Sequence, residues 1–96
     1  MKMILIAHRN QSRPKEDFEP WFEPEAKKAL SLMAEDFFRE IYSRADGKGA
    51  VMVVEADTVE EVERRLQELP FVQNDLLSFE IYPVVPYRGI VDAAKS

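Results

Sequence analysis

The sequence has 96 residues, which is enough for a single domain over residues 1–96 and leaves no room for a second. Its 13 basic and 18 acidic residues give a net charge of −5, and the basic residues form no contiguous run, which argues against a nucleic-acid partner. The chain lacks cysteine, a signal-peptide pattern and any run near the ~20 apolar residues that span a bilayer. We therefore expect a soluble, cytoplasmic protein without disulfides, thiolate metal sites or a membrane partner.

The first part of the chain predicts a strand, a long connection and a helix. Residues 3–8 are an apolar run of strand length. Residues 9–24 are polar and proline-containing, which is typical of a connection with room for one helical turn. Residues 25–35 carry apolar residues at helical spacing and follow Pro24, which suits the first position of a helix.

The middle of the chain predicts a β-hairpin. Residues 37–44 and 50–56 are rich in aromatic and β-branched residues. Between them, residues 46–49 (DGKG) are a turn signal, and they lack the length, the following helix and the Ser or Thr of a phosphate-binding loop. Two strands joined by so short a link are expected to pair antiparallel.

The remaining segments predict a second helix and a last strand. Thr58 begins the helix, Glu61 completes a capping box with it, and Pro70 ends it. Residues 77–85 form the last strand. For the tail, residues 91–96, disorder and contact with a neighbouring chain both remain open.

This order, β-α-β-β-α-β, predicts a ferredoxin-like α+β fold with a four-stranded antiparallel sheet and two helices on one face. We expect the helix stripes to supply core residues (Leu30, Met33, Val59, Val62, Leu66 and Leu69). Strand alternation places Met52, Val54, Ala56, Leu77, Phe79 and Ile81 toward the helices and Val51, Val53, Glu55, Ser78, Glu80 and Tyr82 on the other face. In the second strand it sets Phe38, Glu40, Tyr42 and Arg44 opposite Phe37, Arg39 and Ile41, with the facing of the two sets left open.

The uncovered sheet face mixes valine and aromatic residues with a few charges. It is too apolar for a surface exposed to water and too polar for a simple core. A second copy's sheet stacked on it, with a polar-dotted cavity between, would account for both properties. We therefore expect the chain to pair with itself, as a homodimer or a higher multiple of dimers.

Residues 37–90 resemble the muconolactone isomerase-like branch of the dimeric α/β-barrel superfamily. The similar pieces are REIYSRADGKGAVMVVEAD, the helix ending in LPFV, and the strand LLSFEIYPVVPY. The resemblance implies sheet-to-sheet pairing of two subunits, ligand pockets on the inner sheet surface, and isomerisation of an unsaturated lactone by proton transfer without a cofactor. The stretch LPFVQNDLLSFEIYP is also similar to YCII-related proteins, but the histidine that this group carries early in its first helix is missing from PEAKKAL here.

Four residues are the candidate catalytic groups. His8, the only histidine, can act as a base or acid near neutral pH, and its alternative is a structural role at a strand end. Glu55 and Glu80 are expected on adjacent strands about 4.8 Å apart, where two carboxylates could converge on one pocket. Tyr42 could donate a hydrogen bond to a developing enolate. For the glutamates the alternative is pairing with an arginine or a place at the rim.

Three further residues are candidate substrate-binding groups. Arg39 or Arg44 could hold a substrate carboxylate through two parallel bonds, although both cannot face one cavity from a regular strand. Their alternative is an ion pair between subunits. Trp21, in the segment FEPWFEP, could cover a pocket or anchor an interface, or pack on the chain's own helix. One histidine and no cysteine predict no metal site.

The sequence thus predicts a cofactor-free isomerase that acts by proton transfer on a small unsaturated lactone or related anionic compound. A non-catalytic module that binds a small apolar or anionic ligand is the first alternative. A cofactor-independent monooxygenase acting on aromatic substrates is the second.

Overall fold

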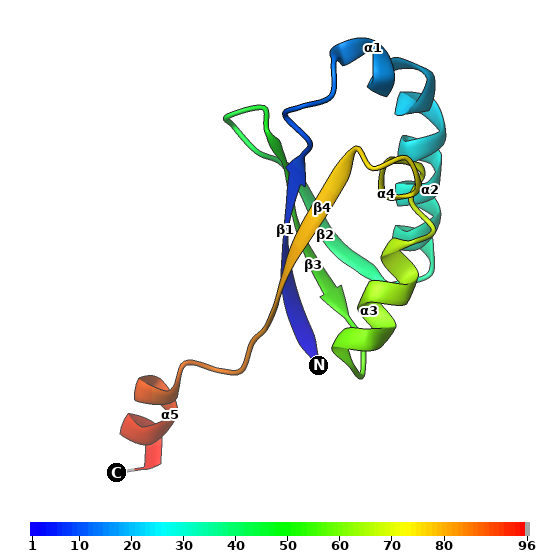
Figure 1. Cartoon of the computed structure of the whole chain (residues 1–96). Helices are drawn as coiled ribbons and strands as arrows, with labels where there is room; N and C mark the ends of the chain where they lie inside the picture. The colour runs from blue at the N-terminus through cyan, green and yellow to red at the C-terminus, as the bar shows by residue number, and fades with distance from the viewer. Residues whose placement is uncertain (96) are drawn as a thin grey trace.

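A computed structural model describes residues 1–95 of the chain (Figure 1). In chain order the elements are β1 (Lys2–Arg9), α1 (Lys15–Phe18), the 3-10 helix η1 (Glu19–Trp21), α2 (Phe22–Ala34), β2 (Phe38–Ser43), β3 (Gly49–Glu55), α3 (Val59–Leu66), α4 (Pro70–Gln73), β4 (Leu77–Pro83) and α5 (Arg88–Lys95).

The four strands form one antiparallel sheet in the order β2-β3-β1-β4. Helices α2 and α3 lie on the same face of this sheet, with α1 at one end of that layer and α4 beside α2 (Figure 1). The predicted ferredoxin-like α+β fold is therefore confirmed. Because β1 lies between β3 and β4, the expectation that β3 and β4 are adjacent is wrong.

Helix α2 differs from its prediction in both its start and its buried side. It begins at Phe22, so Pro24 lies inside the first turn, where backbone N–H groups have no intrahelical acceptor. Leu30 and Met33, expected in the core, are 68% and 38% exposed, whereas Leu32 is fully buried. The helix carries apolar residues on more than one side, so periodicity alone did not determine which side packs on the sheet.

Helix α3 follows its prediction closely. The Thr58 hydroxyl accepts a hydrogen bond from the Glu61 N–H at 3.1 Å, and the Glu61 carboxylate accepts one from the Asp57 N–H at 3.1 Å. This confirms the capping role of both side chains. The helix ends at Leu66, and Pro70 occupies the first position of the short helix α4 instead of terminating α3 directly.

A β-bulge in β2 changes the predicted facing of that strand. Phe38 pairs with Val54 and Glu40 pairs with Val53, so the register shifts between them. Phe38 therefore points toward the helices with Val54 and is 2% exposed, while Glu40 points to the other face. The prediction that these two side chains share a face is wrong, because strict alternation does not survive a bulge.

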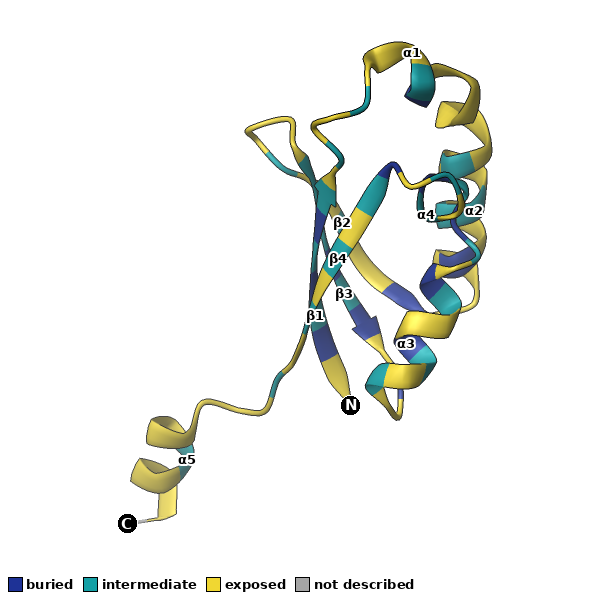
Figure 2. Ribbon diagram, in the orientation of Figure 1, coloured by how far each residue is buried: buried dark blue, intermediate teal, exposed yellow. Residues whose placement is uncertain are grey.

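The core lies between the sheet and the helices. Its buried side chains come from alternate strand positions, from the inner sides of α2 and α3 and from the residues that flank these elements: Met3, Leu5, Ala7, Leu32, Phe37, Phe38, Met52, Val54, Ala56, Val62, Leu66 and Leu69. Figure 2 shows these dark-blue segments facing one another across the two layers. The expected core role of the α3 stripe is confirmed.

The opposite side of the sheet carries no helix among residues 1–95 and is called the open face below (Figure 1). Strand register assigns to it Lys2, Ile4, Ile6 and His8 of β1, Glu40 and Tyr42 of β2, Val51, Val53 and Glu55 of β3, and Ser78, Glu80 and Tyr82 of β4. Its centre is apolar, and its charged side chains lie at the ends of the inner strands and on the edge strands β2 and β4.

The chain beyond β4 forms an arm, residues 84–95, that stands away from the sheet and its helices (Figure 1). The arm stretches the molecule to 57 Å along its longest axis, against 27 Å and 20 Å along the others. Its helix α5 includes residues of the tail whose state the sequence left open; Ser96 lies outside the described residues. None of the helices formed by residues 1–95 has the length and apolar character needed to traverse a bilayer.

Candidate functional site

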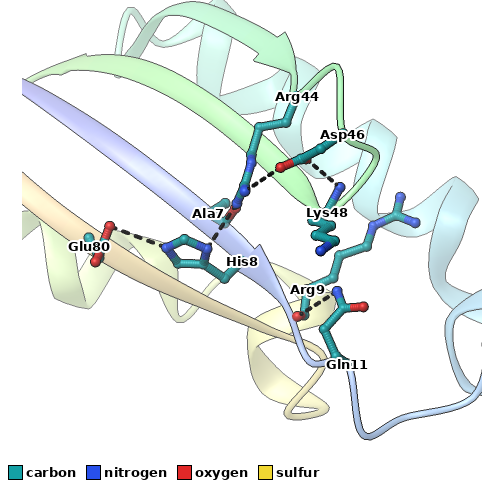
Figure 3. Close-up of polar contacts among 8 residues, drawn as sticks. All are labelled: Ala7, His8, Arg9, Gln11, Arg44, Asp46, Lys48 and Glu80. Atoms are coloured by element: carbon teal, nitrogen blue, oxygen red, sulfur yellow. Dashed lines mark hydrogen bonds and ion pairs between the residues drawn. The ribbon is translucent and has the colours of Figure 1, made fainter.

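His8 lies at the end of β1, between two charged side chains on the open face (Figure 3). Its Nδ1 is 2.9 Å from Nη1 of Arg44, and its Nε2 is 3.2 Å from a carboxylate oxygen of Glu80. Arginine can only donate, so Nδ1 of His8 accepts this hydrogen bond. The neutral ring then carries its proton on Nε2 and directs it at Glu80.

Arg44 is itself held by Asp46 in the turn before β3. Its Nη2 contacts an Asp46 carboxylate oxygen at 2.6 Å, and the other oxygen accepts a hydrogen bond from the Lys48 N–H at 2.9 Å. The backbone hydrogen bond from Lys48, together with Arg44, holds the pKa of Asp46 below its usual value. The DGKG turn thus fixes an arginine that in turn orients His8, giving a chain of contacts from Asp46 to Glu80.

Glu55 and Glu80 do not meet. Glu55 pairs across the ladder with Lys2 and Glu80 with Ile6, so β1 separates them and they are about 13 Å apart along the strands. Glu55 instead contacts the amino group of Met1 at 2.9 Å, and this bond lowers its pKa. The expectation that the two carboxylates converge on one pocket is wrong because it assumed adjacent strands.

Tyr42, Arg39 and Trp21 are dispersed. The Tyr42 hydroxyl donates to Glu40 at 2.5 Å, and this hydrogen bond raises the pKa of Tyr42. Arg39 lies in the β2 bulge, where its Nε donates to the backbone oxygen of Asp36 at 2.8 Å. Trp21 ends η1 and is 36% exposed. Of the seven predicted site residues, the structure joins Arg44 and Glu80 through His8, which contacts both, and places Arg39 near enough to Glu55 for its charge to help lower the pKa of that carboxyl.

A cavity of about 300 Å³ opens on the other side of the sheet, between it and helices α2 and α4. Its lining is mostly apolar: Phe22, Ala26, Ala29, Phe38, Ile41, Ala50, Met52, Leu69, Phe71 and Leu77, with Arg9, Glu25, Ser43 and Gly49. None of the seven predicted site residues lines it. A concave apolar pocket with a few polar groups is the usual form of a small-molecule site.

Glu25 is the residue lining this cavity whose pKa is shifted from its ordinary value. Burial raises its pKa, and the hydrogen bond from the Phe71 N–H to its carboxylate, at 2.9 Å, opposes that rise only in part. A carboxyl group in this state can take or give a proton nearer neutral pH than an exposed one.

Arg9 places a positive charge in the lining of the cavity. Its guanidinium carbon lies 5.6 Å from the ring centroid of Phe18 and 5.8 Å from that of Phe22, which places the cation against two aromatic faces. On β1 it follows His8, so alternation sends the two side chains to opposite faces of the sheet.

Glu25 and Arg9 are not among the site residues that the sequence predicts. In the sequence Glu25 is only the first residue of a predicted helix, and its position relative to Ala29 and Leu32 is the available signal. Spacings of four and three place a carboxylate on the same helix side as the partly buried Ala29 and the buried Leu32. Over residues 1–95, His, Cys, Asp and Glu side chains form no group of three or more suited to a metal ion.

No protein-family model matches the sequence, and no curated protein matches it. Among solved structures, the chain is similar to the 5-chloro-2-hydroxyhydroquinone dehydrochlorinase of Burkholderia phenoliruptrix AC1100, in complex with 2,5-dihydroxybenzoquinone. The TM-score is 0.69 with 14% identity, over 93% of this chain and 98% of that one. A hypothetical protein from Pyrococcus horikoshii aligns with a TM-score of 0.48 and 15% identity, over 90% and 94% of the two chains. The first similarity shows that this chain shares the dehydrochlorinase's fold.

Proposed function

We propose that the chain is a cofactor-free, isomerase-like enzyme that moves a proton within a small cyclic anionic compound bound in the cavity. The observation that supports this most is Glu25, a carboxyl of raised pKa in an apolar pocket that Arg9 also lines. The dehydrochlorinase that shares the fold acts on a small oxygen-substituted ring, which is the size and polarity that a cavity of about 300 Å³ would accept. An unsaturated lactone belongs to the same class.

The proposed reaction needs only these two side chains. Glu25 removes a proton from the carbon next to the substrate's carbonyl, and the electron pair moves to the carbonyl oxygen, which becomes an enolate oxygen. Arg9 stabilises that negative charge. The protonated Glu25 then returns the proton to the far carbon of the conjugated system, so the double bond shifts and no atom is gained or lost.

Solvent-proton exchange tests this function. Enolisable butenolides and hydroxyquinones are incubated with the protein in deuterated water, and deuterium incorporation is followed by NMR. We expect exchange with the native chain and a loss of about 10²-fold or more in Glu25→Gln. Glu23→Gln, on the exposed side of the same helix, is the matched control and keeps the rate. Equal exchange in Glu25→Gln and the native chain would exclude Glu25 as the base.

A second candidate site, around His8 on the open face, is supported by a separate observation. His8 lies between Glu80 and Arg44, so a ligand on the open face whose anionic group draws Arg44 away from Nδ1 would meet that ring nitrogen as a base and Arg44 as its cation. These are residues that the sequence predicted for catalysis and binding. In this version His8→Gln abolishes exchange and Glu25→Gln does not, so the same experiment separates the two sites. Binding of a compound in the cavity without any exchange would instead favour the non-catalytic module.

A further inference from the structure

A second cavity, of about 180 Å³, adjoins the cavity that Glu25 lines. Arg9 and Phe22 belong to the lining of both, so the two cavities meet at these side chains. The new cavity is also lined by Arg13 and Lys15, and none of its lining residues within 1–95 is acidic. It is called the basic cavity here, and the first is called the Glu25 cavity.

The positive charge of the basic cavity is only partly neutralised within the protein. Arg13 donates from Nε to a carboxylate oxygen of Asp17 at 2.8 Å. Arg9 and Lys15 form no ion pair with any of residues 1–95. Three cations against one carboxylate leave an excess of two positive charges, in a chain whose net charge is −5. A hollow lined by charge of one sign concentrates ligands of the opposite sign, so this cavity favours a dianion.

The loop that carries these cations is held in place by the protein itself. Asn10 donates its backbone N–H to the Leu76 oxygen at 2.9 Å and its side-chain amide to the Asp75 oxygen at 3.0 Å. Arg13 donates from Nη1 to the backbone oxygen of Asn74 at 3.1 Å. The loop is therefore tied to the segment between α4 and β4. A ligand that binds such a fixed loop loses little free energy in ordering it.

The cations keep hydrogen-bond donors available for a ligand. Nη2 of Arg13 makes no hydrogen bond to residues 1–95, because the bonds of this side chain come from Nε and Nη1. Arg9 is held by the rings of Phe18 and Phe22, and its guanidinium donates no hydrogen bond within the same residues. Figure 3 shows the Arg9 side chain directed away from that of His8. Lys15, at the start of α1, adds its ammonium group.

This set of donors fits a phosphate group better than a carboxylate. A phosphate monoester carries about −1.5 to −2 charges near pH 7 and presents its terminal oxygens tetrahedrally, so cations on three sides can each reach one. A carboxylate has a single charge and a planar pair of oxygens. Arginine and lysine are the usual side chains that bind phosphate. At about 30 Å³ for each water, the 180 Å³ of the cavity equals roughly six waters, which is enough room for the phosphorus and its oxygens.

We propose that the basic cavity binds the phosphate group of a ligand whose ring lies in the Glu25 cavity. The substrate class is then a small cyclic compound that carries a phosphate monoester. Arg9, which lines both cavities, lies between the ring and the phosphate and can donate to each. The proposal rests on the proposed function for the place of the ring, and it is tested by binding without turnover, so that the failure of either one is seen separately.

A titration followed by amide NMR tests it with three probes at low ionic strength: inorganic phosphate, phenyl phosphate and benzoate. Inorganic phosphate is expected to shift the amides of residues 10–13 and Lys15. Phenyl phosphate is expected to shift these and also the amides of Ala29 and Ala50 in the Glu25 cavity, and to bind more tightly than phosphate because its ring is buried. Benzoate is expected to bind at least about 5-fold more weakly than phenyl phosphate, because it carries half the charge.

Two variants separate the basic cavity from the charge of the whole chain. Lys15→Gln removes an exposed cation without an ion pair, so the fold is expected to stay intact and the dissociation constant of phenyl phosphate to rise about 5-fold. Arg64→Gln removes an exposed cation from α3 and changes the net charge equally, and it is expected to leave that constant unchanged.

Three results would overturn the proposal. The first is an inorganic phosphate titration that shifts no amide of residues 10–15, or equal affinities of phenyl phosphate for the native chain and Lys15→Gln. The second is benzoate binding as tightly as phenyl phosphate, which would make the anion a carboxylate. The third is phenyl phosphate shifting only the basic cavity, which would leave the ring outside the Glu25 cavity. Binding as expected, without deuterium exchange into any enolisable compound, would instead remove the proposed proton transfer and keep the phosphate site.

Discussion

The carboxylate of Glu25 accepts a hydrogen bond from the backbone N–H of Phe71 at 2.9 Å, and this contact links the first turn of α2 to the first turn of α4. The N–H groups at the start of a helix have no partner inside it, so the carboxylate satisfies one of those of α4. The same contact holds two walls of the cavity together, because both residues line it.

The stability contribution of Glu25 is expected to fall as pH rises. Burial raises its folded pKa above the unfolded value near 4.5, so the folded chain binds more protons in that range. Its favourable contribution is then complete below the unfolded pKa and is lost as pH rises through the folded pKa. Urea unfolding of the native chain and Glu25→Gln over a pH series measures this, and the difference between them should move in favour of the variant with increasing pH.

The matched variant Glu23→Gln corrects for the other titrating groups. Glu23 is exposed and pairs with Lys27 on the same helix, so its removal should leave the pH dependence close to native. A pH-independent difference between the native chain and Glu25→Gln would show that the folded pKa of Glu25 is not raised.

Two glycines of the β2–β3 turn should respond very differently to alanine. Gly49 has φ of +151° and a Cβ placed there would lie 1.8 Å from the backbone oxygen of Ala7, whereas Gly47 has φ of +72° with nothing within 4 Å of its Cβ position. Gly47→Ala is expected to lose about 1–2 kcal/mol of unfolding free energy from the left-handed backbone alone. Gly49→Ala is expected to lose more than about 3 kcal/mol or to fail to fold, because the close approach of β1 and β3 must open. Similar midpoints in urea unfolding for the two variants would contradict this.

The fold was predictable from the sequence because its signals are local. The DGKG turn, the Thr58–Glu61 cap and the alternation in β3 and β4 each depend on a few neighbouring residues, and all are confirmed. The predictions that were wrong concern features that depend on packing between distant parts of the chain. The β2 bulge turned Phe38 inward, and the strand order separated Glu55 from Glu80.

The candidate site was predictable only in part for the same reason. The contact of His8 with Arg44 and Glu80 follows from which strands lie side by side, and the sequence suggested these residues without their arrangement. The cavity depends on the distance between α2 and the sheet, and the periodicity of the sequence does not predict that distance. Glu25 becomes notable only once α4 packs beside it and partly buries its carboxylate.

Two leucines of α2 provide a direct test of which side of the helix packs on the sheet. Leu32 is fully buried and Leu30 is 68% exposed. Leu32→Ala is expected to cost about 2–5 kcal/mol of unfolding free energy through lost burial and the cavity left behind. Leu30→Ala is expected to change it by less than about 0.5 kcal/mol. Urea unfolding of both variants measures the difference, and a larger cost at Leu30 would place the other side of α2 against the sheet.

The ring tautomer of His8 is expected to depend on Arg44. Because Arg44 donates to Nδ1 at 2.9 Å, neutral His8 should hold its proton on Nε2, which faces Glu80 at 3.2 Å. Nitrogen-15 NMR of the neutral imidazole distinguishes a protonated from an unprotonated ring nitrogen, and we expect Nδ1 to be the unprotonated one. Arg44→Gln removes the obligatory donor, so a mixture of both tautomers should appear, whereas Glu80→Gln keeps an acceptor near Nε2 and should preserve the native form. A native ring protonated on Nδ1 would mean that Arg44 does not bond His8 in solution, and the oriented base of the open face would be lost with it.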